Sequence, residues 1–266
     1  YMKTAFIICI LLNSLMAGAW TLNLSTRKGF SASEINIVVG SDNCTNANMT
    51  ADQLKGYVQE AIDSFWNRVP TSSLKITNSG VSTTSLNGDD LTAAAAKASV
   101  NSIIIGCNND EPSFSDTSIL GVGGMSCTGN NCRGAILMND AAGTNLASAS
   151  HQEVLAALAH EMGHALGLGH TSQKEALMYY DLTGKDQKFL HQDDMDGITY
   201  LYPNPKKAAG LAGSCSSINL KNDGSGNSFL ISFITGLLFL LFIRMKSIRF
   251  SFLMIDSSSM LSPPKS

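Results

Sequence analysis

The feature that most constrains this chain is the run His160–His170, which reads HEMGHALGLGH. Side chains four residues apart in a helix project from the same side, so His160 and His164 can bind one Zn²⁺ at ~2.0–2.1 Å from each ring nitrogen. Gly167 is a suitable end for that helix, because glycine readily takes the left-handed conformation that reverses the chain. His170 then follows as a third ligand. The run therefore predicts a helix, a turn and one metal site.

Glu161 directly follows the first of these histidines and is predicted to be a general base. Three protein ligands leave one zinc coordination position open, which is typical of a catalytic rather than a structural zinc site. Zinc lowers the pKa of a bound water towards ~7, so a neighbouring carboxylate can take its proton and later give it to a leaving amine. The motif thus indicates peptide-bond hydrolysis without a covalent intermediate. The alternative is a surface helix that carries three histidines for no functional reason.

Hydrophobic periodicity and capping signals around this motif predict a mixed α/β fold. Ser150 and Glu153 form a capping-box pattern that opens the histidine-bearing helix, while Thr50 and Gln53 open an earlier helix that Pro70 stops. Strands are expected where apolar residues alternate or β-branched residues gather, over residues 19–24, 34–39, 100–107 and 134–138. Residues 121–133 are rich in Gly, Cys and Asn, so we expect them to form a loop.

Composition argues against disorder and against nucleic-acid binding. Hydrophobic residues make up 44% of the chain, which is enough for a sizeable core. Lys and Arg together number 18 against 21 Asp and Glu, giving a formal net charge of −3. Because the chain has no surplus of basic side chains to neutralise phosphates, we expect no nucleic-acid partner.

The two ends of the sequence are predicted to be targeting segments outside the folded domain. The first combines an early lysine, an apolar centre and small residues before Trp20, which is typical of a secretory signal peptide. The second is an apolar run after a Gly/Ser/Asn-rich linker, which predicts either a membrane-spanning anchor or a removable sorting segment. Basic residues after it place the tail on the cytoplasmic side. The signal peptide, domain, linker, anchor and tail are expected over residues 1–19, 20–205, 206–228, 229–243 and 244–266.

Export would bring the domain to the extracellular or periplasmic side, with the C-terminal anchor in the membrane. Oxidising conditions on that side favour disulfides. Cys127 and Cys132 enclose a short loop, and Cys44 with Cys107 is the second pair that we expect. Without a further Cys or His pair nearby, the CxxxxC spacing is a poor zinc signature. Cys215 in the linker is left over, either free, paired with another chain or modified.

The histidine run and the residues after it resemble a known family. HExxHxxGxxH followed by a methionine turn, here Ala176–Tyr179, is similar to the metzincin signature. Thr171, the Ala-Leu-Met-Tyr sequence and the segment 190–202 together resemble matrixins, the matrix-metalloprotease branch of the metzincins. The resemblance implies a zinc endopeptidase with one catalytic zinc ion, the catalytic residue Glu161 and the zinc ligands His160, His164 and His170.

The resemblance also implies the metzincin (zincin) fold, an α/β fold with a twisted, mostly parallel five-stranded sheet, one antiparallel edge strand and three helices. A protein or peptide substrate would bind extended along that edge, for which residues 119–123 are the candidate. Met178 would lie beneath the zinc ligands, and His191 would belong to a closing helix rather than bind metal. We expect the protein to be a monomer.

The chain departs from the matrixin pattern at several positions. The remaining histidines are His151 and His191, so a second, histidine-rich zinc site has no visible ligands. Tyr180 replaces a proline two residues after Met178, and it is a candidate zinc ligand or oxyanion-stabilising group, with simple packing as the alternative. Calcium (Ca²⁺) binding is possible but unsupported, because the acidic residues that offer oxygens are better explained as solvated loop carboxylates. These residues are Asp89, Asp90, Asp110 and Glu111.

Two other functions stay open beside the endopeptidase. A non-catalytic, zinc-containing surface protein on a metzincin scaffold would bind partners through the sheet edge, although an intact Glu161 argues against it. A zinc hydrolase acting on non-peptide amides or esters would use the same residues but would leave casein-like proteins uncut.

Overall fold

The computed structural model describes residues 20–24, 29–182 and 185–205. Its α-helices are α2 (Ala51–Ser64), α3 (Leu91–Lys97), α4 (His151–Leu166) and α5 (Gln192–Leu201). Its strands are β1 (Thr21–Leu22), β2 (Glu34–Val39), β3 (Lys75–Val81), β4 (Ser102–Asn108), β5 (Gly121–Thr128), β6 (Asn131–Asn139) and β7 (Leu168–Gly169). Short 3-10 helices are η2 (Trp66–Arg68), η3 (Pro112–Ser115) and η4 (Asn145–Ser148).

Five of these strands form one sheet in the order β3-β2-β4-β6-β5. Neighbouring strands run parallel except for β5, which pairs antiparallel with β6 and forms one edge. This is the mostly parallel five-stranded sheet with one antiparallel edge strand that the resemblance implies. The three expected helices are α2, α4 and α5, whereas the short helix α3 and strand β3 were not predicted. β1 and β7 form a separate antiparallel pair.

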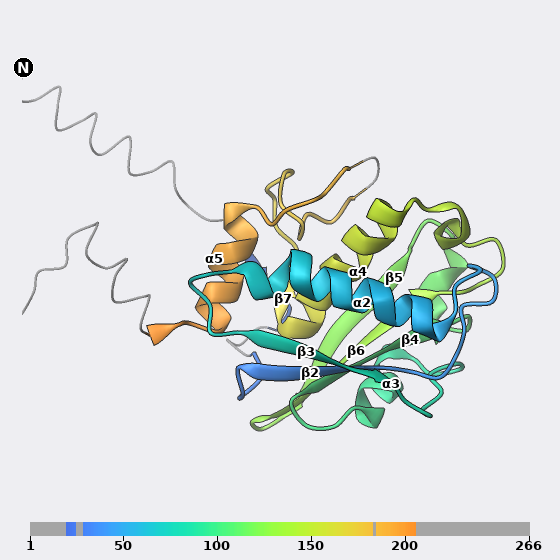
Figure 1. Ribbon diagram of the computed structural model, residues 1–266, viewed down its shortest axis with the longest axis horizontal. Coiled ribbons are helices and arrows are strands. Elements are labelled where there is room, and N and C mark those ends of the chain that lie inside the picture. The colour runs from blue at the N-terminus through green and yellow to red at the C-terminus, as the bar shows by residue number, and fades with distance from the viewer. Residues whose placement is uncertain (1–19, 25–28, 183–184, 206–266) are drawn as a thin grey trace, which may run out of the picture. The chain divides into compact units, whose positions relative to one another are not determined.

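Helices cover both faces of the sheet, with α2 and α4 on one face and α3 on the other (Figure 1). The central strand β4 explains this arrangement, because it is buried along its whole length. Ile103 and Ile105 belong to the core that includes α2 and α4, while Ile104 packs in a second cluster with the alanines of α3. A run of β-branched residues is expected of a parallel strand covered on both sides, and each such side chain stabilises the fold by about 1.5–3 kcal/mol when fully buried.

Most predicted elements are found, with changes in their bounds. β2 covers residues 34–39 as predicted, and α2 and α4 begin after Thr50 and Ser150, each with a complete capping box. α2 ends at Ser64, before Pro70, and η2 follows it. The strand predicted over residues 19–24 is reduced to the two residues of β1.

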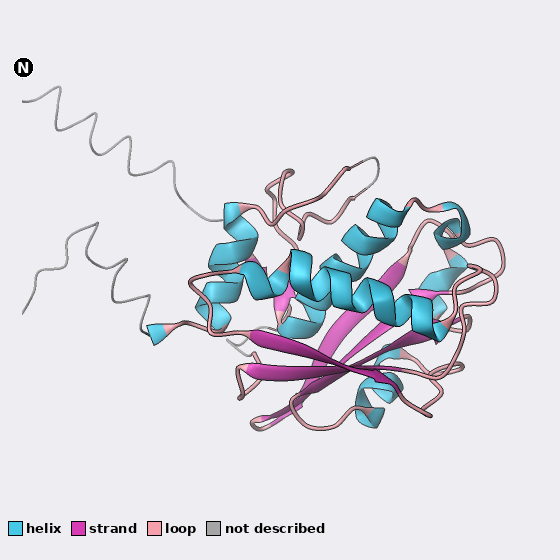
Figure 2. Cartoon of the chain, in the orientation of Figure 1, coloured by secondary structure: helices cyan, strands magenta, loops and turns pink. Residues whose placement is uncertain are grey.

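The prediction of a loop over residues 121–133 is wrong. These residues form most of the hairpin of β5 and β6 (Figure 2), in which Cys127 lies opposite Cys132. Glycine usually weakens a strand, which is why the composition indicates a loop. Here a β-carbon on Gly123 would overlap the backbone carbonyl of Glu161 in α4. The glycine therefore lets the edge strand lie directly against the histidine-bearing helix.

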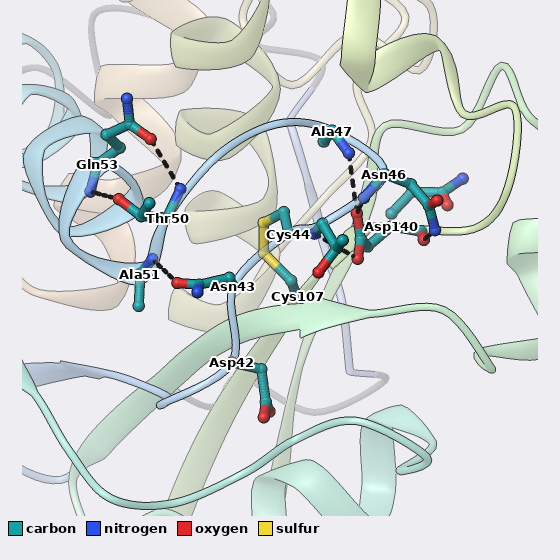
Figure 3. The surroundings of a disulfide bond; sticks show 12 residues. Asp42, Asn43, Cys44, Asn46, Ala47, Thr50, Ala51, Gln53, Cys107 and Asp140 are labelled. Carbon is teal, nitrogen blue, oxygen red and sulfur yellow. Dashed lines mark hydrogen bonds between the residues drawn. A yellow bond between two sulfur atoms is a disulfide. The ribbon is translucent and has the colours of Figure 1, made fainter.

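Both predicted disulfides are present, Cys44–Cys107 and Cys127–Cys132. The first joins the loop before α2 to strand β4 (Figure 3). Close to it, the Asp140 carboxylate accepts hydrogen bonds from three successive backbone N–H groups of the same loop, those of Thr45, Asn46 and Ala47. The loop before α2 is therefore fixed to the sheet by one covalent bond and by a buried carboxylate.

Removing the Cys44–Cys107 bridge by a double Cys→Ala substitution is expected to lower the free energy of unfolding by about 4 kcal/mol. The bridge spans 63 residues, and closing a long loop removes more entropy from the unfolded chain than closing a short one. The Cys127–Cys132 bridge spans 5 residues, so the same change there is expected to cost about 2 kcal/mol. Urea unfolding of the oxidised proteins measures both losses, and equal losses would contradict this argument.

The predicted targeting segments lie outside the described residues, and so does Cys215. They are residues 1–19, 206–228, 229–243 and 244–266. Within the described part of the chain, no helix combines the length and apolar character needed to cross a membrane. The signal peptide, linker, anchor and tail therefore stay predictions from the sequence.

Candidate metal centre

Helix α4 and the turn after it bring the three predicted ligands together. His160 and His164 lie one turn apart on α4, and Gly167 follows in the left-handed conformation with φ 109°, as predicted. The chain then passes through β7 and reaches His170. The possible ligand atoms of the three histidines all lie within 4.8 Å of one another. The sequence motif therefore folds into a compact cluster of imidazoles.

The separations between the ring nitrogens fit one zinc ion. The Nε2 atom of His170 lies 3.3 Å from that of His160 and 3.2 Å from that of His164. Tetrahedral coordination at a Zn–N distance of ~2.0–2.1 Å places ligand nitrogens about 3.3–3.4 Å apart. The Nε2 atom of His170 thus lies at the distance that a shared zinc ion would require from both other histidines, and all three rings offer a nitrogen within 4.8 Å of one another.

Backbone carbonyls set the orientation of two of the rings. Nδ1 of His160 donates to the carbonyl of Leu177 at 2.7 Å, and Nδ1 of His164 donates to that of Leu168 at 2.8 Å. With the proton on Nδ1, each Nε2 presents its lone pair to the shared point. Burial, helped by a neighbouring imidazole, lowers the pKa of His160 to about 3 and that of His164 to about 4. Both rings are therefore neutral at pH 7, the form that binds metal.

A methionine turn lies beneath the ligand helix, as the resemblance implies. Met178 is buried, and a β-carbon on Gly163 would overlap its sulfur atom, so the turn and α4 are in direct contact. The residue before it, Leu177, supplies the carbonyl that orients His160. The turn therefore supports the ligand helix and fixes one of its imidazoles.

Asp194 in the first turn of α5 holds the methionine turn in place, a role that the sequence did not predict. It is 1% exposed, and its carboxylate accepts hydrogen bonds from the backbone N–H groups of Leu177 at 2.8 Å, Met178 at 3.0 Å and His191 at 2.9 Å. Burial raises the pKa of this carboxyl, and the three donors oppose that shift. Asp194 lies three residues after His191, and this spacing indicates the capping box of α5. It does not indicate the contact with the methionine turn.

Glu161 lies between the ligand helix and the edge strand. Its carboxyl accepts a hydrogen bond from the backbone N–H of Gly123, and a β-carbon on Gly121 would come within 3.4 Å of its Cγ. Burial raises the pKa of Glu161 to about 8, against the opposing effect of that hydrogen bond. A cation bound nearby would lower this pKa again. The predicted base is thus beside the candidate substrate edge, although β5 begins at Gly121 rather than at residue 119.

The other aromatic and histidine candidates lie in ordinary structural surroundings. Tyr180 is 67% exposed, and its ring packs against that of Tyr179 with centroids 4.5 Å apart. His191 is the N-cap of α5, the closing helix to which the resemblance assigned it. His151 pairs with Glu60 at 2.9 Å, in the first turn of α4.

Most of the acidic residues considered as calcium ligands form hydrogen bonds or ion pairs with α3. Asp89 pairs with a lysine of α3, Asp90 caps that helix, and Glu111 accepts a hydrogen bond from its first backbone N–H. Within the described residues, neither these three nor Asp110 belongs to a group of side chains that could hold a metal ion.

Comparison with known proteins identifies the same part of the chain. The family model described as Matrixin matches residues 105–203. Metalloendoproteinase 2-MMP from Arabidopsis thaliana is 41% identical over 70 residues, which are 26% of this chain and 18% of that protein. Matrix metalloproteinase-9 from Canis lupus familiaris is 53% identical over 49 residues, 18% of this chain and 7% of that protein. Interstitial collagenase B from Mus musculus is 49% identical over 51 residues, 18% of this chain and 11% of that protein.

The matched segments cover no more than 18% of the length of each of these relatives. The family match nevertheless includes every element that builds the cluster, from β5 and β6 through α4 and the methionine turn to α5. It supports a zinc metalloendopeptidase at the level of the family. The matches therefore support a matrixin-like catalytic domain of the metzincin class.

Proposed function

We propose that this protein is a zinc-dependent endopeptidase that hydrolyses peptide bonds of extracellular or periplasmic proteins. The observation that carries the proposal is the convergence of the Nε2 atoms of His160, His164 and His170 at separations that suit one zinc ion. These three residues are the zinc ligands of the proposal, and Glu161 is its catalytic residue. The matrixin match supports the same chemistry at the level of the family.

In the proposed mechanism, the ion and Glu161 have different chemical roles. Zinc, when bound, supplies a Lewis acid that polarises the scissile carbonyl and acidifies a water molecule. The Glu161 carboxylate takes a proton from that water and returns it to the nitrogen of the leaving amine. The N–H of Gly123 donates to the carboxyl and fixes its orientation during both transfers. Because burial favours the protonated form of Glu161, the side chain can hold the proton between the two steps.

Strand β5 supports an extended peptide as the substrate. It is an edge of the five-stranded sheet, so the backbone groups on its outer side are available to pair with another strand. Gly121 and Gly123 lie in its first half, beside Glu161. A peptide paired there would run past the carboxyl that transfers the proton.

Removal of zinc is expected to abolish cleavage of an unfolded protein such as casein, and addition of about one equivalent is expected to restore it. The ion supplies the Lewis acid, and no other group in the cluster replaces it. Gel analysis follows cleavage, and mass spectrometry counts zinc per chain. Undiminished cleavage after zinc removal would overturn the proposal. A chain that binds zinc but cuts no protein would favour the non-catalytic surface protein, and hydrolysis of esters or small amides alone would favour the third function.

We also propose that the catalytic domain, residues 20–205, is exported and tethered to a membrane. The support is the sequence of residues 1–19 and 229–243, with the linker 206–228 and the basic tail 244–266 around the second segment. Externally added protease should degrade the domain on intact cells that express the full chain. Recovery of the intact domain from the cytosol would contradict export.

A further inference from the structure

The segment Trp20–Asn23 crosses the turn that connects the metal-binding histidines, and we call it the N-terminal strap. Its residues Thr21–Leu22 form β1, which pairs antiparallel with β7 (Leu168–Gly169). β7 lies between the end of α4 and His170. The strap therefore runs along the short stretch of chain that delivers the third ligand.

Three carbonyl groups of this stretch accept hydrogen bonds from the strap. The hydroxyl of Thr21 donates to the carbonyl of His170 at 2.5 Å. Asn23 donates twice, from its backbone N–H to the carbonyl of Gly167 at 2.9 Å and from its side-chain amide to that of His164 at 3.2 Å. The last carbonyls of a helix have no partner inside the helix, so donors from elsewhere fix its end. Here two of the acceptors belong to histidines of the metal cluster.

The strap also acts on one imidazole through β7. The ring of His164 donates from Nδ1 to the carbonyl of Leu168, and Leu168 is the residue paired with Leu22 of the strap. A shift of the strap would move this carbonyl and turn the ring that depends on it. The strap therefore influences both where the third ligand lies and how the second ligand is oriented.

The first residue of the strap is fixed to α5. The backbone N–H of Trp20 donates to Oδ1 of Asp193 at 3.1 Å, and its ring packs against Tyr200 with centroids 4.7 Å apart. Thr21 and Asn23 are exposed, so their side chains lie outside the hydrophobic core. Substituting them removes hydrogen bonds without opening a cavity, which makes their role testable in a folded protein.

We propose that Thr21 and Asn23 are positioning residues for the zinc site. Their hydrogen bonds hold the turn from Gly167 to His170 so that His164 and His170 present Nε2 to the same ion. They act through the backbone of the ligand residues. This inference rests on the zinc site of the proposed function and extends it to a segment far from the HExxH helix in sequence.

The test measures zinc affinity of the full chain by competition with a chelator, together with the visible spectrum of the Co²⁺-substituted protein. Thr21→Val keeps the shape of the side chain and removes the hydroxyl, while Thr21→Ser keeps the hydroxyl. We expect Thr21→Val and Asn23→Ala combined to weaken zinc binding by about 10–100-fold, as loss of outer-shell partners does elsewhere. The Co²⁺ spectrum should change with them, and Thr21→Ser should stay within about twofold of wild type.

Thr77→Val is the matched control, because Thr77 is an exposed strand residue whose hydroxyl also donates a hydrogen bond, on the opposite edge strand β3. It should leave zinc affinity unchanged. Wild-type affinity and an unchanged Co²⁺ spectrum in the combined variant would overturn the positioning role, as would an equal loss in Thr77→Val. Failure of the proposed function can be told apart from failure of the positioning role. A chain that binds zinc without cutting protein still allows the zinc affinities of the strap variants and the control to be compared. A wild-type chain that binds no zinc would overturn both.

Discussion

Replacement of Glu161 by glutamine is expected to lower kcat/KM for peptide cleavage by about 10²–10⁴-fold while zinc binding stays unchanged. Glutamine has almost the same shape and keeps an oxygen that can accept the N–H of Gly123, so the side chain should stay in place. An amide does not take a proton from water at neutral pH, so the loss falls on proton transfer. A fluorogenic peptide gives kcat/KM, and mass spectrometry gives zinc per chain.

Glu153→Gln is the matched control for this experiment. Glu153 lies on the same helix, in the capping box of α4, where glutamine serves as well as glutamate. Its variant should cleave at the wild-type rate. Wild-type cleavage by Glu161→Gln would show that another group takes the proton and would remove Glu161 from the mechanism.

Replacement of Asp194 by alanine is expected to lower the free energy of unfolding by about 3 kcal/mol or more and to weaken zinc binding as well. The change leaves three backbone N–H groups without their acceptor, two of them buried, and a buried group left in this way costs about 1–3 kcal/mol. It also frees the methionine turn, whose Leu177 carbonyl orients His160. Urea unfolding of the metal-free protein and zinc titration measure the two effects separately.

Asp196→Ala provides the comparison, because Asp196 is an exposed acidic residue on the same helix that accepts a hydrogen bond from a neighbouring glutamine side chain. The loss of unfolding free energy in Asp194→Asn should fall between those of Asp194→Ala and Asp196→Ala, since asparagine keeps one acceptor oxygen. If Asp194→Ala unfolds at the same urea concentration as Asp196→Ala, the carboxylate does not hold the turn.

The features that could be predicted from the sequence are those encoded by short-range patterns. The spacing of His160 and His164 follows from the helical repeat, and Gly167 takes the left-handed conformation that few other residues adopt. The capping box at Ser150, another short-range pattern, predicted where α4 begins. The candidate ligand set was therefore visible within a single short segment of chain.

The features that could not be predicted depend on contacts between residues far apart in the sequence. β5 looked like a loop because its glycines are explained by distant contacts: Gly123 lies against the backbone of α4, and Gly124 lies against Leu91 of α3. From the sequence alone, Asp194 is explained as an ordinary capping residue. Its hydrogen bonds with the methionine turn depend on the fold. The strap residues Thr21 and Asn23 carry no motif, and their hydrogen bonds reach residues 164–170.

The contact between Gly123 and the backbone of Glu161 limits how selectivity can evolve on this scaffold. Any side chain at residue 123 would push the edge strand away from α4, so close contact between the strand proposed to pair with the peptide and the helix that carries Glu161 depends on a glycine there. For the proposed endopeptidase, we expect new preferences to come from exposed side chains beyond the methionine turn, where Tyr180 and Phe189 are 67% and 69% exposed. Directed evolution towards a new cleavage sequence should accumulate changes there and leave the glycine untouched.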